Sequence, residues 1–208
     1  MTPLSLQELL EEREQLLPLT VEQYHQMIAG GILPEGEPYE LLDGQIVRKE
    51  RRDAREQGMT VGHEHAWVVT KLASLGRKLE RLGCCVRTQQ PVSLPPCDEP
   101  EPDGAVLIGT EDDYRDHHPT AAEVLCVIEV AGASLRRDRT TKLAIYASSD
   151  IPQYLIINLP DRVIEVYSQP LKRAAHYGKL VTLTPKDTLH LPAANGRELP
   201  IPVRRLLP

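Results

Sequence analysis

The sequence predicts an α/β (α+β) domain with a central mixed β-sheet flanked by helices, and three observations favour this class. Two apolar runs, residues 104–108 and 124–130, have the length and composition of buried strands. Residues 60–83 carry apolar side chains at alternating steps of four and three, as in a long amphipathic helix. Hairpin patterns near residues 43–44 and 159–162 add further strands on both sides. Strands joined partly by turns and partly by helices are typical of a mixed sheet.

The chain as a whole has the properties of a globular protein. Its 208 residues are enough for one domain with a sizeable core, and they are 41% hydrophobic and 26% charged. No apolar run approaches the roughly 20 residues that span a bilayer, and the acidic N-terminus lacks the features of a secretion signal. The four cysteines show no CxxC spacing. We therefore expect a cytoplasmic protein with reduced thiols and no membrane partner. Its net charge of -6 argues against a general nucleic-acid coat protein but permits local contact with DNA.

Residues 1–37 are predicted to form an N-terminal helical segment. One helix begins at Pro3, and a second follows a capping box at Thr20 and ends at Gly30. The pair Asp43-Gly44 then predicts a tight hairpin, because these residue types tolerate the positive φ angles of a type I′ turn. The next residues, 48–57, form a dense charge run, which is either a solvated loop or a loop that contacts DNA.

The long helix over residues 60–83 carries His65 on its apolar face. A histidine in that position is either a satisfied core residue or a side chain directed at a functional site. His63, two residues earlier, faces elsewhere, so a paired histidine metal site on this helix is not expected. A strand over residues 84–92 follows.

The second half of the chain completes the predicted core, which we assign to residues 38–185. A helix over residues 135–149 follows the strand 124–130, and a last strand lies near residues 180–183. Residues 186–208 are proline-rich, and we expect a tail with little regular structure.

Candidate chemistry is concentrated at Asp103, Glu129 and Lys142. Alternation along a strand puts Glu129 on one face with Val127 and Ala131, where an ionised carboxylate is unfavourable unless it is paired or bound to a metal. Asp103 opens the neighbouring strand, and two converging carboxylates favour a hard cation such as Mg²⁺, for which Mn²⁺ can substitute.

The following helix is expected to bring the Lys142 ammonium over these carboxylates, where it would orient water or stabilise charge on a phosphate. Two simpler interpretations stay open. In the first, Asp138 and Lys142, which stand four residues apart, form a surface ion pair. In the second, Asp103 is a turn residue.

Several motifs in this order resemble the Uma2 family of the PD-(D/E)xK, restriction-endonuclease-like superfamily. The resemblance covers residues 39–167 and depends on Tyr39-Glu40-Leu41-Leu42-Asp43-Gly44, Glu64-His65, Pro102-Asp103, Glu129-Val130, Ser134, Asp138, Lys142-Leu143-Ala144-Ile145-Tyr146-Ala147 and Ile151-Pro152-Gln153-Tyr154. It implies a Mg²⁺-dependent nuclease site on a central mixed sheet.

The resemblance also implies roles for single residues. Asp103 and Glu129 match the metal-binding carboxylates, the Val130 carbonyl is a further ligand, and Glu40 and His65 match an acidic residue and a histidine of the pattern. The superfamily lysine usually stands two residues after the glutamate, at the position that Ala131 occupies here. Lys142 fits the position that the family pattern uses instead.

The sequence-based hypothesis is therefore a Mg²⁺-dependent DNA endonuclease that acts as a homodimer. Five residues beside the site are candidates for substrate binding, namely Ser134, Arg136, Arg137, Asp138 and Arg139. Two alternatives are a catalytically silent nucleic-acid-binding or regulatory protein that keeps the fold, and a structural or interaction protein. The endonuclease hypothesis requires the carboxylates of Asp103 and Glu129 to lie within roughly 4–6 Å of each other. It also requires the side chains of His65 and Lys142 to point towards them.

Overall fold

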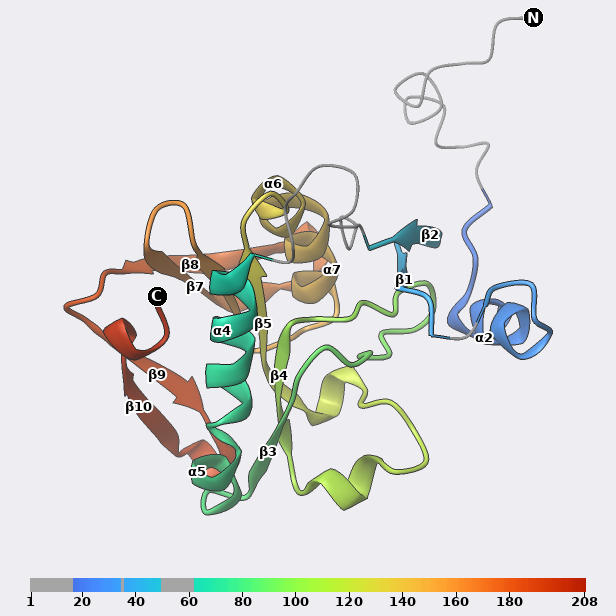
Figure 1. Ribbon diagram of the computed structural model, residues 1–208. Helices are drawn as coiled ribbons and strands as arrows, with labels where there is room; N and C mark the ends of the chain where they lie inside the picture. Colours follow the sequence, from blue (N-terminus) through green and yellow to red (C-terminus); the bar gives the residue numbers. More distant parts are fainter. Residues whose placement is uncertain (1–16, 35, 50–61) are drawn as a thin grey trace, which may run out of the picture.

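A six-stranded mixed sheet forms the centre of the molecule (Figure 1). The computed structural model describes residues 17–34, 36–49 and 62–208. β5 and β6 are parallel and all other neighbours are antiparallel, which confirms the predicted mixed sheet. In spatial order the strands are β3 (Cys84–Arg87), β4 (Gly104–Ile108), β5 (Val124–Ala131), β6 (Gln153–Asn158), β7 (Val163–Leu171) and β8 (His176–Leu183).

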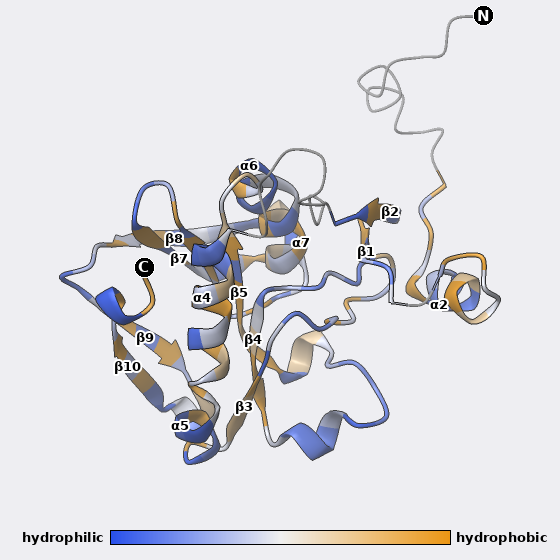
Figure 2. Ribbon diagram, viewed as in Figure 1, coloured by the Kyte–Doolittle hydropathy of each residue, from blue (hydrophilic) through white to orange (hydrophobic). Residues whose placement is uncertain are grey.

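Each face of the sheet is covered by a separate layer. On one face, α4 (His63–Ala73), α5 (Gly76–Glu80) and the hairpin of β9 (Thr188–Pro192) and β10 (Glu198–Pro202) bury Ile128 and Val130 of β5. On the other face, α6 (Leu135–Arg137), the π-helical turn η4 (Asp138–Lys142) and α7 (Leu143–Ser148) lie over Val127 and Ala131. Hydrophobic residues accordingly concentrate in strands such as β5, whereas the surface turns are hydrophilic (Figure 2).

The N-terminal part packs beside this core as a short helix and a hairpin. The helix α2 (Val21–Ala29) begins with the predicted capping box between Thr20 and Gln23. β1 (Tyr39–Leu42) and β2 (Gln45–Arg48) pair through a turn in which Asp43 and Gly44 have φ angles of 53° and 71°, as a type I′ turn requires. A bridge between Leu41 and Glu99 ties the hairpin to the rest of the chain.

The prediction that residues 186–208 form a tail with little regular structure is wrong, because these residues form the β9–β10 hairpin. Residues of β9 and β10 alternate apolar and polar side chains, and Leu189, Leu191 and Ile201 are buried in the same core as α4. The prolines are compatible with strands here because each strand of a two-stranded sheet has a free edge that needs no N–H donor.

Other differences concern the ends of elements. The long helix is interrupted between α4 and α5, and the strand that follows it is shorter than predicted and stops at Arg87. Gln89 has a positive φ of 53°, which a strand cannot accommodate. The helix predicted from Pro3, most of the charge run 48–57 and the predicted helix start at Thr60 lie outside the described residues. In the part that the structure describes, no helix is long and apolar enough to cross a membrane.

Candidate active site

Asp103 and Glu129 meet at one edge of the sheet, where β4 begins and β5 approaches its end. The antiparallel ladder of β4 and β5 ends at the pair of Gly104 and Ile128, and Asp103 and Glu129 are the next residues beyond that pair. Their carboxylates are close enough for the charge of Asp103 to raise the pKa of Glu129. The Val130 amide donates a hydrogen bond of 2.9 Å to Asp103 Oδ2, which fixes the aspartate against β5. Asp103 lies in a bend directly before β4, as the turn interpretation has it, but its side chain also contacts His65 and the Val130 amide. The separation of the two carboxylates stays a prediction.

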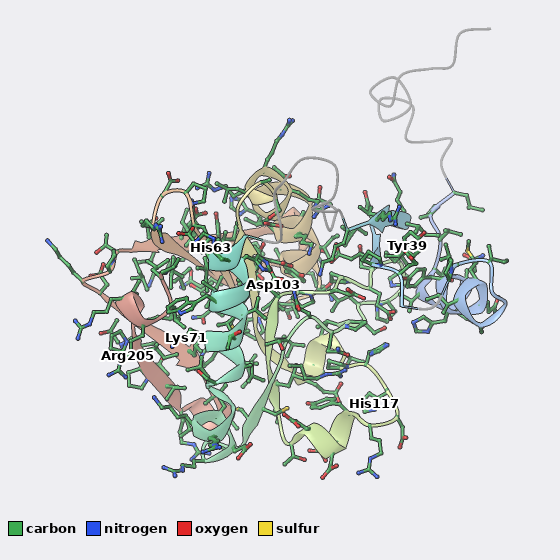
Figure 3. The ribbon with its side chains drawn as sticks, viewed as in Figure 1. Tyr39, His63, Lys71, Asp103, His117 and Arg205 are labelled. Carbon is green, nitrogen blue, oxygen red and sulfur yellow. The ribbon has the colours of Figure 1, made fainter. Side chains whose placement is uncertain are left out.

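His65 of α4 is directed at Asp103. Its Nε2 lies 3.1 Å from Asp103 Oδ2, and its side chain is 24% exposed. The hydrogen bond that His65 donates to Asp103 raises the pKa of His65, although burial opposes the shift. Burial alone would raise the pKa of Asp103, but the contact with His65 lowers it below its ordinary value. Figure 3 shows Asp103 beside the first turns of α4, which begins at the exposed His63. The core-histidine alternative for His65 is not supported.

Lys142 reaches two buried glutamates. Its Nζ donates to Glu129 Oε1 at 2.8 Å and to Glu40 Oε1 at 2.9 Å, and the three side chains are at most 4% exposed. η4 therefore folds back over the sheet and delivers the amine, as predicted. Asp138 is itself buried, so a surface pair between Asp138 and Lys142 does not form.

The carboxylates of Glu40, Asp103, Glu129 and Asp138 together with Lys142 form a cluster, and this cluster contains more negative than positive charge. Burial raises the pKa of Glu129 to about 7, and the charges of Asp103 and Asp138 add to that effect while Lys142 opposes it. Burial likewise raises the pKa of Asp138. For Glu40, burial acts in the same direction, but the charges of Lys142 and Lys49 and the hydrogen bonds from Lys142 and the Glu101 amide together outweigh it, and the pKa falls. A cation bound beside these carboxylates would stabilise their ionised forms and oppose the increase in pKa.

Two further residues belong to this site, although the sequence analysis did not single them out. The Tyr146 hydroxyl donates to Glu129 Oε1 at 2.8 Å and is fully buried. Its position one turn after Lys142 was a signal that could have found it. Lys49 follows β2, and its Nζ lies 3.9 Å from Glu40 and 3.8 Å from Glu101. Nothing in the charge run distinguishes Lys49 from its neighbours.

The carboxylates of Asp103 and Glu129 have the same pattern of hydrogen bonds. In each, one oxygen accepts two hydrogen bonds: Asp103 Oδ2 from His65 and Val130, and Glu129 Oε1 from Lys142 and Tyr146. Among the described residues, the second oxygen of each carboxylate has no hydrogen-bond donor. Each carboxylate is thus held on one side and left with one oxygen for another partner.

The donor chemistry of the cluster fits a hard cation. The buried atoms Glu40 Oε2 and Asp138 Oδ2 have no hydrogen-bond partner, so oxygen ligands are in excess. Over residues 17–34, 36–49 and 62–208, no three His, Cys, Asp or Glu side chains are arranged to hold a metal together. Mg²⁺ fits this restriction because it is usually bound through one or two carboxylates, with waters and substrate phosphates as the other ligands.

The predicted substrate-binding residues are in different environments. Arg136 of α6 is exposed, and Arg137 is half-buried near Asp138. Arg139 points away from the cluster and pairs with Glu165 at 2.5 Å. The Ser134 side chain forms a hydrogen bond that lowers the pKa of Asp138 against the effect of burial. Ser134 and Asp138 therefore lie at the site, Arg136 is exposed to solvent, and Arg139 is paired with Glu165 outside the site.

Comparisons with known proteins agree with this architecture. The model of the Uma2 family, described as "Putative restriction endonuclease", matches residues 21–203. The crystal structure of "a putative nuclease belonging to DUF820" from Anabaena variabilis ATCC 29413 aligns with a TM-score of 0.63 and 16% identity, over 91% of this chain and 97% of that chain. At this identity the alignment establishes a shared fold. A search of curated proteins gives no match.

Proposed function

Because the chain belongs to the Uma2 family, we propose that it is a Mg²⁺-dependent endonuclease that hydrolyses phosphodiester bonds in DNA. The observation that carries this proposal is the convergence of Asp103, Glu129 and Lys142 at one sheet edge. Three separate parts of the chain, namely β4, β5 and the η4 turn, are needed to build it. A cluster of buried carboxylates with a buried lysine is unfavourable for folding, and its presence at one site supports a chemical role.

Asp103 and Glu129 are the residues that would hold the cation, through the carboxylate oxygens that carry no hydrogen bond, and the Val130 carbonyl is a further candidate ligand. When bound, Mg²⁺ lowers the pKa of water and neutralises charge on a phosphate. His65 and Tyr146 position these carboxylates, since each donates to the oxygen on the other side. Glu40 acts on the opposite side of Lys142 and fixes the direction of its amine.

Lys142 acts by its charge. Burial would lower the pKa of its ammonium, but Glu129 and Glu40 outweigh burial and raise it. The ammonium therefore stays protonated at neutral pH and does not accept a proton. Hydrolysis joins the oxygen of one water to phosphorus and breaks one P–O bond, and the departing oxygen leaves protonated. A fixed positive charge beside the phosphate stabilises the negative charge that develops in this step.

The substrate and the assembly are part of the proposal. Arg136 is the exposed cation beside the cluster and is suited to contact a DNA phosphate. Cutting both strands of a duplex requires two such sites, so we also propose a homodimer. Of the three arginines in residues 136–139, Arg139 contributes little charge to DNA binding, because Glu165 neutralises it.

The test compares cleavage of supercoiled plasmid by wild-type protein and by Lys142→Ala in Mg²⁺ or Mn²⁺. We expect Lys142→Ala to lower the rate by about 100-fold or more, because one transition-state charge contact is lost. Lys179→Ala removes an exposed lysine of β8 and should leave the rate unchanged. Circular dichroism establishes that each variant is folded.

Metal binding provides a second measurement. Titration calorimetry with Mn²⁺ should show binding by wild-type protein and by Lys142→Ala, and loss of binding in Asp103→Asn. Unchanged cleavage by Lys142→Ala would refute the role of this lysine. Plasmid binding without cleavage in either metal would instead favour a catalytically silent nucleic-acid-binding protein.

A further inference from the structure

A groove with a volume of about 890 Å³ lies beside the candidate active site. Arg139 and Thr140 of η4 and Leu143 of α7 form one wall. Its floor is the β7–β8 part of the sheet, including Glu165 and Leu180. The groove uses the outward side of the same helical segment whose inward side carries Lys142. It is therefore close to the cluster but does not contain its carboxylates.

The register of the sheet relates the groove to the cluster. Glu129 pairs with Ile156, Ile156 with Glu165, and Glu165 with Thr182, so these residues form one row across four strands on the same face. Glu129 and Glu165 are two strand spacings apart, which is about 10 Å. That separation is at most a few nucleotide steps, since the phosphates of one strand of B-DNA advance about 3.4 Å each along the helix axis. A strand with one phosphate at Glu129 can therefore place a nearby nucleotide at the groove.

Buried side chains hold Arg139 rigidly in the wall of the groove. Its Nε and Nη2 donate to both oxygens of Glu165, at 2.5 to 3.2 Å. Asn158 and Tyr167 donate to the same carboxylate at 3.0 and 2.7 Å, and Asn158 is fully buried. The guanidinium plane is thereby fixed, and among the described residues its Nη1 has no partner. A fixed planar cation is a suitable surface for stacking.

The chemistry of the lining selects an uncharged planar group. Glu165 neutralises Arg139, and Asp161 adds a further negative charge, so a phosphate gains little there. The remaining lining is largely apolar, with Leu143 and Val163, and Leu180 is 53% exposed. Thr182 adds a hydroxyl group that can donate and accept hydrogen bonds, and the Thr140 hydroxyl, which donates to the Arg136 carbonyl at 2.8 Å, can still accept one. Apolar walls, an arginine plane and a few hydroxyls are what an unstacked nucleobase requires.

We propose that this groove binds an unpaired nucleobase of the nucleic acid whose phosphates lie at the Asp103–Glu129 edge. The proposal rests on the proposed function and narrows its substrate class to strands with at least one unpaired nucleotide near the site, such as single strands, flaps or frayed ends. A base inside a duplex is stacked on both faces and does not enter a groove formed by a sheet and a helix.

The test measures binding without cleavage, by fluorescence anisotropy in EDTA. The probes are a labelled strand of ten thymidines and a strand of ten abasic residues, which has the same phosphates and no bases. We expect wild-type protein to bind the thymidine strand about tenfold or more tightly than the abasic strand, the scale of base stacking on a protein surface. Equal affinity for both strands overturns the proposal.

Two variants and two matched controls locate the effect. Ala144→Trp fills the groove from α7, and Arg139→Ala removes the fixed plane; each should abolish the preference for the thymidine strand. Ala73→Trp and Arg77→Ala change exposed residues of the helices on the opposite face and should preserve it. If Ala144→Trp does not fold, Arg139→Ala decides. A preference that survives in folded Ala144→Trp and in Arg139→Ala overturns the assignment to this groove.

The binding and cleavage measurements on wild-type protein together separate this proposal from the proposed function. If wild-type protein prefers the thymidine strand but never cleaves DNA in Mg²⁺ or Mn²⁺, the groove stands and the endonuclease proposal fails. If plasmid is cleaved and both strands bind equally, the nuclease stands and the groove proposal fails.

Discussion

Lys142 and Arg139 lie three residues apart on η4, and each meets a glutamate of the same row of the sheet, with opposite results. Arg139 and Glu165 form a one-to-one pair, completed by Asn158 and Tyr167, and the arginine is 44% exposed. Lys142 is 1% exposed and is shared between Glu129 and Glu40, with Asp103 and Asp138 also buried nearby. The first pair is balanced in charge and hydrogen bonds. The second cluster is not.

This difference separates a structural ion pair from a candidate site. The Arg139 contact lowers the pKa of Glu165 although burial would raise it, so this carboxylate is satisfied as an anion. Burial raises the pKa of Glu129 to about 7 even with Lys142 in contact. Folding alone does not require such an unsatisfied group, and clusters of this kind are typical of positions that bind a ligand or a metal.

The largest expected difference between the two regions is in stability. Lys142→Met leaves Glu129 buried without a contacting counter-ion and Glu40 with only the Lys49 ammonium at 3.9 Å, and should lower the free energy of unfolding by about 3–5 kcal/mol. Arg139→Met should lower it by at most about 2 kcal/mol, because Glu165 keeps the hydrogen bonds from Asn158 and Tyr167. Urea denaturation in EDTA measures both. Equal losses would contradict the comparison, and adding Glu129→Gln should reduce the effect of Lys142→Met by more than about 1 kcal/mol.

The two glutamates should also give opposite pH dependence. Between about pH 4.5 and 7 the folded chain keeps a proton on Glu129 that the unfolded chain has lost, so this group makes stability fall as pH rises, by about 3 kcal/mol. Glu165 has a lowered pKa, so its contribution is present above about pH 4.5 and is lost as pH falls through the folded pKa.

Carbon-13 NMR of the glutamate carboxyl groups in metal-free buffer measures these titrations directly. Glu129→Gln should remove the signal that titrates near pH 7, and Mg²⁺ should shift that signal to lower pH. A Glu129 carboxyl that titrates near pH 4.5 without metal would show that the cluster is balanced after all.

The smallest expected difference comes from single hydroxyl groups. Tyr146→Phe removes one of two donors to Glu129 Oε1 and should lower stability by about 1–2 kcal/mol and weaken Mn²⁺ binding. Tyr167→Phe removes one of several donors to Glu165, so we expect less than about 1 kcal/mol and unchanged Mn²⁺ binding. Urea denaturation and Mn²⁺ calorimetry distinguish the two. Loss of Mn²⁺ affinity in Tyr167→Phe alone would reverse the assignment of the regions.

The local part of the site was predictable from the sequence. Strand alternation placed Glu129 on the face of Val127 and Ala131, and the position of Asp103 at the start of the neighbouring strand placed it beside Glu129. These inferences need only the period of a strand and the order of the elements. The contact between Lys142 and Glu40 joins residues 102 positions apart. No local pattern encodes it, and only the family resemblance selected Glu40.

Other parts failed for identifiable physical reasons. Lys49 is one of many charges in its segment, and only the position of the β1–β2 hairpin gives it a buried partner. The tail was misassigned because its prolines outweighed the apolar alternation of Leu189, Leu191 and Ile201. In both cases packing between distant segments, rather than local propensity, decides the structure.

The β9–β10 hairpin affects when the site can form during synthesis. Residues 188–207 leave the ribosome after every residue of the candidate site, yet Leu189, Leu191 and Val203 complete the core against Val68 and Leu72 of α4. Until they pack, the helix that carries His65 lacks part of its apolar support, and Asp103 has no fixed histidine partner. We therefore expect ribosome-bound chains that stop before residue 188 to carry both carboxylates without an assembled site. A growing chain would thus assemble the candidate site only as the last described strands dock.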